Sequence, residues 1–192
     1  MMQVVLASAS PRRLALLEQV GVRVQVCPAD FAEADGKAAE ARHVAVNNAR
    51  GKCRAVAAAQ GDAVPVVAAD TIVVIDEDIL GNPADAAAAE AMLNRLSGRS
   101  HTVITGVAVR YRGRELYKDC ATSVLFRRLS AQEIREYVAT GEPLDKAGAY
   151  GIQGRGALLV EKIDGCYNNV VGLPLTMLYE MFKELGADMT GD

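Results

Sequence analysis

Two adjacent arginines begin a predicted helix near the amino terminus. The run Ser8-Ala9-Ser10-Pro11-Arg12-Arg13 follows a short apolar segment, residues 4–7, and Ser10 with Pro11 suits a helix start. The helix dipole disfavours cations in a first turn by a few tenths to about 1 kcal/mol, so we expect an anion to compensate. Free N–H groups, the Ser8 and Ser10 hydroxyls and the two guanidinium groups predict a phosphate-binding site. The alternative is a pair of solvated surface arginines.

A single carboxylate interrupts the most apolar part of the chain. Residues 64–69 form a continuous apolar run typical of a strand buried on both faces, and Asp70 follows before residues 71–75 resume the pattern. Burial disfavours the charged form of an aspartate unless a cation or a metal lies nearby. Asp70 is therefore a candidate general base or metal ligand. The alternative is an aspartate in a turn between two strands.

Three further charged residues gain meaning only if the fold brings them together. Glu33 and Asp35 lie in a polar, acidic loop, and Lys52 lies within a predicted Ala-rich helix, residues 38–59. A lone charged residue in a loop or on a helix is usually solvated. Their role therefore depends on whether they converge on the same site.

Residues 148–156 are dense in glycine. Such a segment lets the backbone approach a flat or phosphorylated ligand, and the Gln153 amide offers a donor and an acceptor to a base edge. The alternative is a plain loop between strands. The segment is not a dinucleotide-binding fingerprint, because Gly154 and Gly156 precede a predicted strand, residues 157–163, rather than a helix.

The remaining motifs exclude several kinds of chemistry. Gly51-Lys52-Cys53 lacks the upstream glycine and the Ser or Thr of a Walker sequence, which argues against P-loop ATP chemistry. His43 and His101 stand beside no plausible nucleophile or second ligand, so a serine-hydrolase triad and a histidine metal site find little support. Carboxylates, Arg and Lys side chains and a hard divalent metal remain, and this inventory matches phosphoanhydride hydrolysis.

Length and composition limit the class of protein. The chain has 192 residues, 51% of them hydrophobic and 23% charged, which is typical of one globular domain. A formal net charge of -3 provides no general basic field for a nucleic acid. Four cysteines without paired spacing, no signal-peptide pattern and no membrane-spanning apolar stretch predict a cytoplasmic protein without a nucleic-acid or membrane partner.

The hydrophobic periodicity predicts strands and helices that alternate along the chain, as in an α/β protein. The expected strands cover residues 4–7, 22–26, 64–75 and 157–163, with a hairpin of 102–110 and 115–126. The expected helices cover residues 11–20, 38–59, 84–96, 130–141 and 174–185. The first strand, helix and strand predict a βαβ-like unit that presents the two arginines.

Several of these motifs together resemble the Maf family. They are Ser8-Ala9-Ser10-Pro11-Arg12-Arg13, Ala69-Asp70-Thr71, Ser97-Gly98, Asp145-Lys146-Ala147-Gly148-Ala149-Tyr150-Gly151-Ile152-Gln153-Gly154 and Asn169-Val170-Val171-Gly172-Leu173-Pro174. The resemblance implies an α/β fold similar to the inosine triphosphatases, with an elongated mixed sheet flanked by helices and two lobes around a cleft. It also implies one Maf-like domain over residues 1–192, and a homodimer.

Maf-like proteins are nucleoside triphosphate pyrophosphatases, and the resemblance implies a role for each matching residue. Asp70 would be the catalytic proton acceptor and Glu33 would assist it, both as ligands of Mg²⁺ or Mn²⁺. The residues expected to hold the triphosphate are Ser8, Arg13 and Lys52. The residues expected to set base choice are Arg12, Thr71 and Gln153. Their combination resembles the branch that hydrolyses dTTP and UTP, with modified pyrimidine nucleotides as further candidate substrates.

One position departs from the family pattern. A lysine usually precedes the proline of a Gly-Lys-Pro-like turn, and this chain has Asn82-Pro83. Loss of a charge-assisted phosphate contact costs about 1.5–3 kcal/mol, so we expect slower turnover or a higher KM unless Lys146 or Arg155 replaces it. The alternatives to a dTTP/UTP enzyme are a pyrophosphatase for 7-methyl-GTP or another nucleotide, and a nucleotide-binding regulator of septum formation with little turnover.

Overall fold

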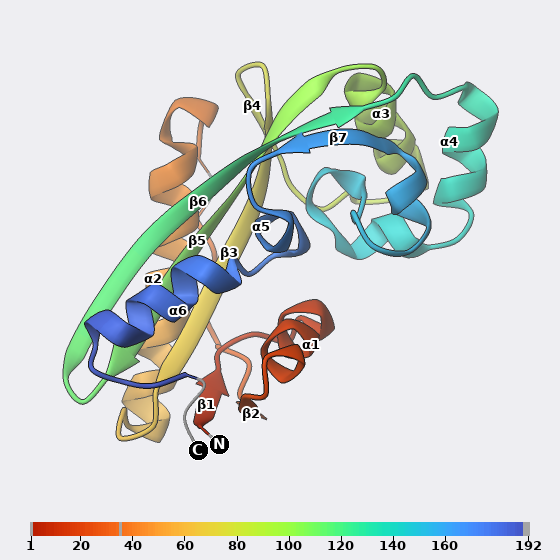
Figure 1. Cartoon of the computed structure of the whole chain (residues 1–192). Helices are drawn as coiled ribbons and strands as arrows, with labels where there is room; N and C mark the ends of the chain where they lie inside the picture. The colour runs from red at the N-terminus through yellow and green to blue at the C-terminus, as the bar shows by residue number, and fades with distance from the viewer. Residues whose placement is uncertain (1, 35, 190–192) are drawn as a thin grey trace.

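A mixed seven-stranded sheet organises the molecule, in a computed structural model that describes residues 2–34 and 36–189 (Figure 1). The strand order is β2-β1-β3-β5-β6-β7, and β4 pairs with β3. The strands are β1 (Gln3–Leu6), β2 (Arg23–Val26), β3 (Val66–Ile75), β4 (Asp78–Leu80), β5 (Ser100–Tyr111), β6 (Arg114–Phe126) and β7 (Val160–Asp164). The helices are α1 (Pro11–Gln19), α2 (Ala41–Gln60), α3 (Ala86–Leu96), α4 (Ala131–Val138), α5 (Tyr167–Val171) and α6 (Leu175–Glu184).

The amino-terminal βαβ unit is confirmed. β1 and β2 pair in parallel, and α1 connects them. The Ser10 side chain caps α1 by accepting a hydrogen bond from the Arg13 N–H, and Pro11 is the first helical residue. The sequence signals at this helix start therefore place both arginines in the first turn, as expected.

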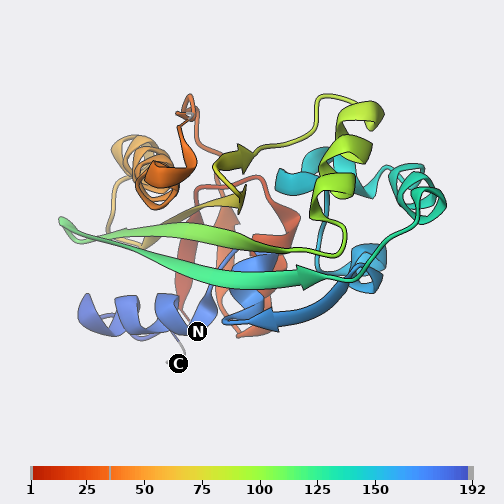
Figure 2. The same cartoon turned by 90° about the horizontal axis from the view of Figure 1, so that it is seen from above.

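The strand β3 holds two parts of the sheet together. Its first residues, Val66 and Val67, pair with β1, and its last residues, Val73 to Ile75, pair with β4. Among the described residues, 68–72 have no strand partner on that edge, so the sheet is open there. Figure 2 shows α2 on one face of the β5–β6 hairpin and α6 on the other, with α3 and α4 at the far end. The opening between the two lobes lies beside the middle of β3.

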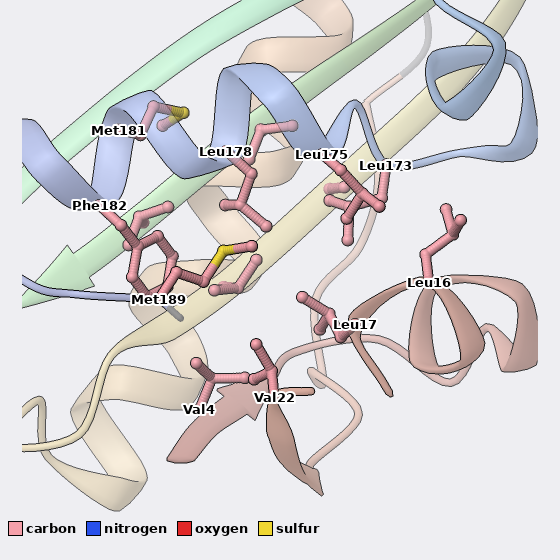
Figure 3. Packing of buried hydrophobic residues seen from close by; sticks show 14 of the residues in the cluster. Val4, Leu16, Leu17, Val22, Leu173, Leu175, Leu178, Met181, Phe182 and Met189 are labelled. Atoms are coloured by element: carbon pink, nitrogen blue, oxygen red, sulfur yellow. The ribbon is translucent and has the colours of Figure 1, made fainter. Parts of the chain in front are cut away.

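Each lobe has its own hydrophobic cluster. In the first, side chains of α6 such as Leu178 and Phe182 pack against Val4 and Leu17 of the βαβ unit (Figure 3). The second joins α3, α4 and the end of β6, and includes Leu93, Phe126, Ile134 and Tyr150. Burial of a large apolar side chain stabilises the fold by about 1.5–3 kcal/mol, so both clusters hold the strands between them firmly in place.

Three expectations about the elements need correction. Asp70 lies inside one continuous strand, so the interpretation as a turn aspartate between two strands is wrong. The strand expected from residue 157 begins at Val160, because residues 154–158 form a 3₁₀ helix. Its Gly156 approaches the Gly151 carbonyl so closely that a Cβ would lie 2.0 Å from the oxygen. The short elements β4 and α5 were not expected from the sequence.

Among the described residues, the longest helices are too polar or too short to cross a bilayer.

Candidate active site

A pocket of about 210 Å³ opens where the edge of β3 lacks a partner strand. Seven of the eight residues to which the resemblance assigns a role line it: Arg12, Arg13, Glu33, Lys52, Asp70, Thr71 and Gln153. They come from α1, the loop before α2, α2 itself, β3 and the glycine-dense segment. The fold therefore brings together residues that are up to 141 positions apart in the chain, from Arg12 to Gln153. Asp35 lies outside the described residues.

The approach of α2 to β3 brings cationic and amide side chains to Asp70. Asp70 pairs in register with Gly106 of β5, so both α-carbons point their substituents to the same sheet face. A Cβ at Gly106 would lie 2.4 Å from the carbonyl carbon of Ala45 in α2. The missing side chain lets the helix backbone lie directly on the sheet. Lys52 and Asn48, one turn apart on α2, then reach Asp70.

Lys52 joins the two predicted catalytic carboxylates. Its Nζ donates to Asp70 Oδ1 at 2.8 Å and also forms an ion pair with Glu33 Oε1. The side chains of Lys52 and Asp70 are 12% and 9% exposed, whereas that of Glu33 is 55% exposed. The buried Asp70 carboxylate is thus in a direct ion pair with Lys52. The condition under which Glu33 and Lys52 gain meaning is therefore met, because both lie at Asp70.

Asn48 holds Asp70 from the other side, and sequence reasoning missed it. Its Nδ2 donates to Asp70 Oδ2 at 3.1 Å, and its Oδ1 accepts the N–H of Ala34 at 2.9 Å. Asn48 is only 3% exposed. The available signal was its position four residues before Lys52, because residues four apart share one helix face.

Arg13 reaches from α1 across the base of the pocket. Its Nε donates to the Gly172 carbonyl at 2.9 Å, and its two terminal nitrogens donate to Ser8 Oγ at 3.1 Å and Thr71 Oγ1 at 3.0 Å. Burial lowers the pKa of Arg13, while the nearby Asp70 carboxylate opposes this change. A guanidinium remains charged in proteins, so Arg13 presents a fixed positive charge beside the candidate base.

Thr71 is held by a chain of hydrogen bonds below Arg13. Thr105 Oγ1 donates to the Asn169 carbonyl at 3.0 Å, which leaves Thr71 to donate to Thr105 across 2.9 Å. Because Thr71 also accepts from Arg13, its hydroxyl proton and one of its two acceptor positions are used within the protein. Strand alternation turns Asp70 and Thr71 to opposite faces of β3, and the open edge makes both available to one pocket.

The segment that carries Gln153 is anchored by a hydrogen-bond network around the half-buried Glu142. The Glu142 carboxylate accepts hydrogen bonds from the Tyr137 hydroxyl at 2.9 Å and from the N–H groups of Arg155 and Gly156 at 3.1 Å. Gln153 itself is exposed and lines the pocket. Its amide is therefore presented from a fixed backbone and is open to a ligand.

The remaining predicted residues differ in their placement. Ser8 is buried and accepts hydrogen bonds from Arg13 and from the Ser10 N–H. It therefore supports Arg13, and direct phosphate contact by Ser8 stays a prediction.

The Nη1 atom of Arg12 lies 3.8 Å from Asp145 Oδ2. Asn82 lines the pocket, and so does Lys146. Arg155 lines a different pocket, beside Arg127 and Glu133.

The arrangement places a charged carboxylate beside a set of anion-binding groups. Arg12 and Arg13 supply positive charge at the start of α1, where the free N–H groups also favour an anion. Lys52 supplies a further positive charge from within α2. Asp70 lies among them with its orientation set by two donors. Such a site is suited to hold a polyphosphate while a water molecule loses a proton to the carboxylate.

Comparison with known proteins identifies the family. The chain is 50% identical over 186 residues to the dTTP/UTP pyrophosphatase of Symbiobacterium thermophilum, covering 97% of this chain and 95% of that protein. It is also 50% identical over 193 residues to the dTTP/UTP pyrophosphatase of Moorella thermoacetica, covering 100% and 99%. A HAM1 protein from Coxiella burnetii shares the fold, with a TM-score of 0.56 and 17% identity over 96% of this chain and 100% of that one. Residues 3–185 match the family described as Maf-like protein, and the chain therefore belongs to that family.

Proposed function

We propose that this protein is a nucleoside triphosphate pyrophosphatase that converts dTTP and UTP to the nucleoside monophosphate and pyrophosphate. One observation carries the proposal: a buried Asp70 lies against Lys52, in the pocket that Arg13 also lines. The identity of 50% across the whole chain to proteins named dTTP/UTP pyrophosphatase supports the choice of nucleotide. Modified pyrimidine nucleotides are further candidate substrates.

In the proposed reaction, Asp70 accepts a proton from a water molecule. Each of its two carboxylate oxygens uses one acceptor position for Lys52 or Asn48, and each keeps another for the water. The water oxygen forms a bond to the α-phosphorus as the bond between that phosphorus and the bridging oxygen breaks. Pyrophosphate leaves with the bonding electrons. Arg13 and Lys52 hold the phosphates in line for this displacement.

The carboxylates fit a hard divalent cation. Asp70 Oδ1 and Glu33 Oε1 both contact Lys52 Nζ, so the two carboxylates lie close to each other. Mg²⁺ is commonly bound by one or two carboxylates together with substrate phosphates, and Asp70 and Glu33 would be those carboxylates. Mg²⁺ or Mn²⁺ held in this way would neutralise the charge of the departing pyrophosphate.

Base choice is assigned to the exposed side of the pocket. Gln153 is free to exchange hydrogen bonds with a pyrimidine edge, because its segment is anchored by Glu142 and not by its own amide. Arg12 and Thr71, which also line the pocket, share this proposed role in base choice, and Thr71 in addition supports Arg13. A cytoplasmic location and a homodimer remain part of the proposal, and gel filtration checks the latter.

The test is a panel of nucleotides with Mg²⁺. The purified protein is incubated with dTTP, UTP, CTP, GTP and 7-methyl-GTP, and pyrophosphate is assayed separately from orthophosphate. We expect pyrophosphate from dTTP and UTP, and none from Asp70→Asn, which should still bind nucleotide because Arg13 and Lys52 remain. Pyrophosphate from 7-methyl-GTP alone would support the other branch. Tight UTP binding without any pyrophosphate from the wild type would favour a regulator instead.

A further inference from the structure

Lys146 is a cation of the pocket without a role in the proposed reaction. It lies between two 3₁₀ turns of the second lobe, and its side chain is 13% exposed. Its Nζ donates to Asp145 Oδ1 and to the Glu142 carbonyl, each at 2.6 Å. An ammonium group has three N–H donors, so one remains for a ligand. The amine is thus fixed by protein acceptors and still able to bind an anion.

Lys146 also contributes to the excess of positive charge in the pocket. The described residues that line it include four cationic side chains, Arg12, Arg13, Lys52 and Lys146, and three carboxylates, Glu33, Asp70 and Asp145. Without Lys146 the two signs would balance. The excess positive charge that favours a polyanion over a neutral ligand therefore depends on this residue.

The carboxylate of Asp145 connects Lys146 with Arg12 of the first lobe. Its Oδ2 lies 3.8 Å from Arg12 Nη1, while its Oδ1 accepts a hydrogen bond from Lys146. Burial raises the pKa of Asp145, but Lys146 and Arg12 outweigh this effect, and the pKa lies below its ordinary value. The carboxylate is 68% exposed, so it can turn into solvent and leave both cations to another anion.

We propose that Lys146 is a further phosphate-binding residue, which with Arg12 exchanges the carboxylate of Asp145 for oxygens of the triphosphate. The inference rests on the proposed function, because it takes the ligand to be a nucleoside triphosphate. The neighbouring segment supports it: the Gly148 N–H donates to the Gly81 carbonyl at 3.1 Å, which brings the loops of Lys146 and Asn82 together. Since both residues line the pocket, a lysine at either position can serve the same phosphate.

The experiment measures binding by calorimetry, with an α,β-imido analogue of dTTP that the enzyme cannot cleave. We expect Lys146→Gln to bind the analogue about tenfold more weakly, the loss of a charge-assisted hydrogen bond. Lys146→Arg should keep most of the affinity. Adding Asn82→Lys to Lys146→Gln should restore it. Arg155→Gln is the matched control, because Arg155 is a cation nine positions away that lines another pocket.

Two results with the variants would overturn the inference. One is Lys146→Gln binding the analogue as tightly as Arg155→Gln does. The other is a loss of affinity that neither Lys146→Arg nor Asn82→Lys restores. That pattern would indicate a packing defect, because the Lys146 side chain lies close to Gly151: a Cβ at Gly151 would be 3.0 Å from the Lys146 Cε. Normal analogue binding by a wild type that releases no pyrophosphate would overturn the proposed function and leave this inference standing. A wild type that binds no analogue would overturn both.

Discussion

The side-chain amide of Asn48 donates to Asp70 Oδ2 at 3.1 Å, and the same nitrogen donates to the Ala34 carbonyl at 3.2 Å. Its oxygen accepts the Ala34 N–H, so one buried amide binds both backbone groups of the residue that follows Glu33. The loop of Glu33 is thereby tied to the candidate base through a single helical side chain. Asn48 therefore helps to set both the orientation of the Asp70 carboxylate and the position of the loop that carries Glu33.

Asn48→Ala should lower kcat for dTTP by about 10- to 100-fold, the range found for residues that orient catalytic ligands. Asp70 loses a donor and Ala34 loses both partners in this variant. Asn48→Asp keeps the shape but places a carboxylate against Asp70, so it should be no better. Asn47→Ala, at an exposed position on the same helix, is the control. Equal kcat values for the Asn48→Ala and Asn47→Ala proteins would contradict the role of Asn48.

Gly106→Ala should destabilise the protein and lower activity together. The added Cβ would meet the backbone of Ala45 and Val46 at 2.4–2.5 Å, and a helix backbone cannot turn away as a side chain can. Overpacking of this kind costs about 1–3 kcal/mol and moves α2 away from Asp70. Urea unfolding and a pyrophosphate assay measure the two effects. Gly81→Ala, where a Cβ would meet nothing within 4 Å, should leave the free energy of unfolding nearly unchanged.

Gln153→Ala should reduce the preference for pyrimidine nucleotides. The exposed amide is the group of the anchored segment that can exchange hydrogen bonds with a base, so its loss removes discrimination and leaves the phosphate contacts. We expect the ratio of kcat/KM for UTP to that for GTP to fall. A ratio equal to that of the wild type would show that another residue reads the base.

The buried His101 should make stability depend on pH below neutrality. Its Nε2 lies 2.7 Å from the Tyr150 hydroxyl, its Nδ1 has no partner among the described residues, and burial lowers the pKa of His101 to about 4 from an ordinary 6.5. The unfolded chain gains a proton near pH 6.5, whereas the folded protein gains it only near pH 4. The contribution of the neutral His101 to the free energy of unfolding is therefore fully present above pH 6.5. About 3 kcal/mol of it is lost as the pH falls toward 4.

Urea unfolding at pH values between 4 and 7.5 measures this dependence. His101→Leu should reduce the slope of the unfolding free energy against pH by the equivalent of about one proton, because it removes the group that titrates. His43→Gln is the control, since His43 is exposed on α2. If the His101→Leu protein shows the same slope as the wild type, the pH dependence belongs to carboxylates and not to His101.

The order of the elements could be predicted from local signals. Ser10 with Pro11, and Ser130 with Glu133, mark helix starts that the structure contains, because each is a hydrogen-bonding pattern confined to four residues. The open edge of β3 was not predictable in this way, since it results from pairing with two strands that lie on opposite sides of it in the chain. The single-domain organisation over residues 1–192 stays a prediction.

The residues of the candidate site also fall into two groups, those that local sequence signals identify and those that only the fold brings into place. Arg13, Lys52 and Asp70 were singled out because their residue types stand in unusual positions or match a family motif. Asn48 has no such mark, and its role depends on the absence of a side chain at Gly106, 58 positions later. Its contribution arises from packing between a helix and a distant strand, which a sequence alone does not specify.

The long strands of the sheet also determine how the molecule deforms. β3, β5 and β6 contain 10, 12 and 13 residues, and β3 and β5 carry side chains of both hydrophobic clusters. The lobes are thus parts of one continuous hydrogen-bonded plate, and changing their separation requires elastic bending of that plate. We expect only a slight change in the radius of gyration when a nucleotide analogue binds, as X-ray scattering can measure. Entry to the pocket then depends on the side chains at its mouth, Arg12 and Asp145, moving on the nanosecond timescale of exposed rotamers.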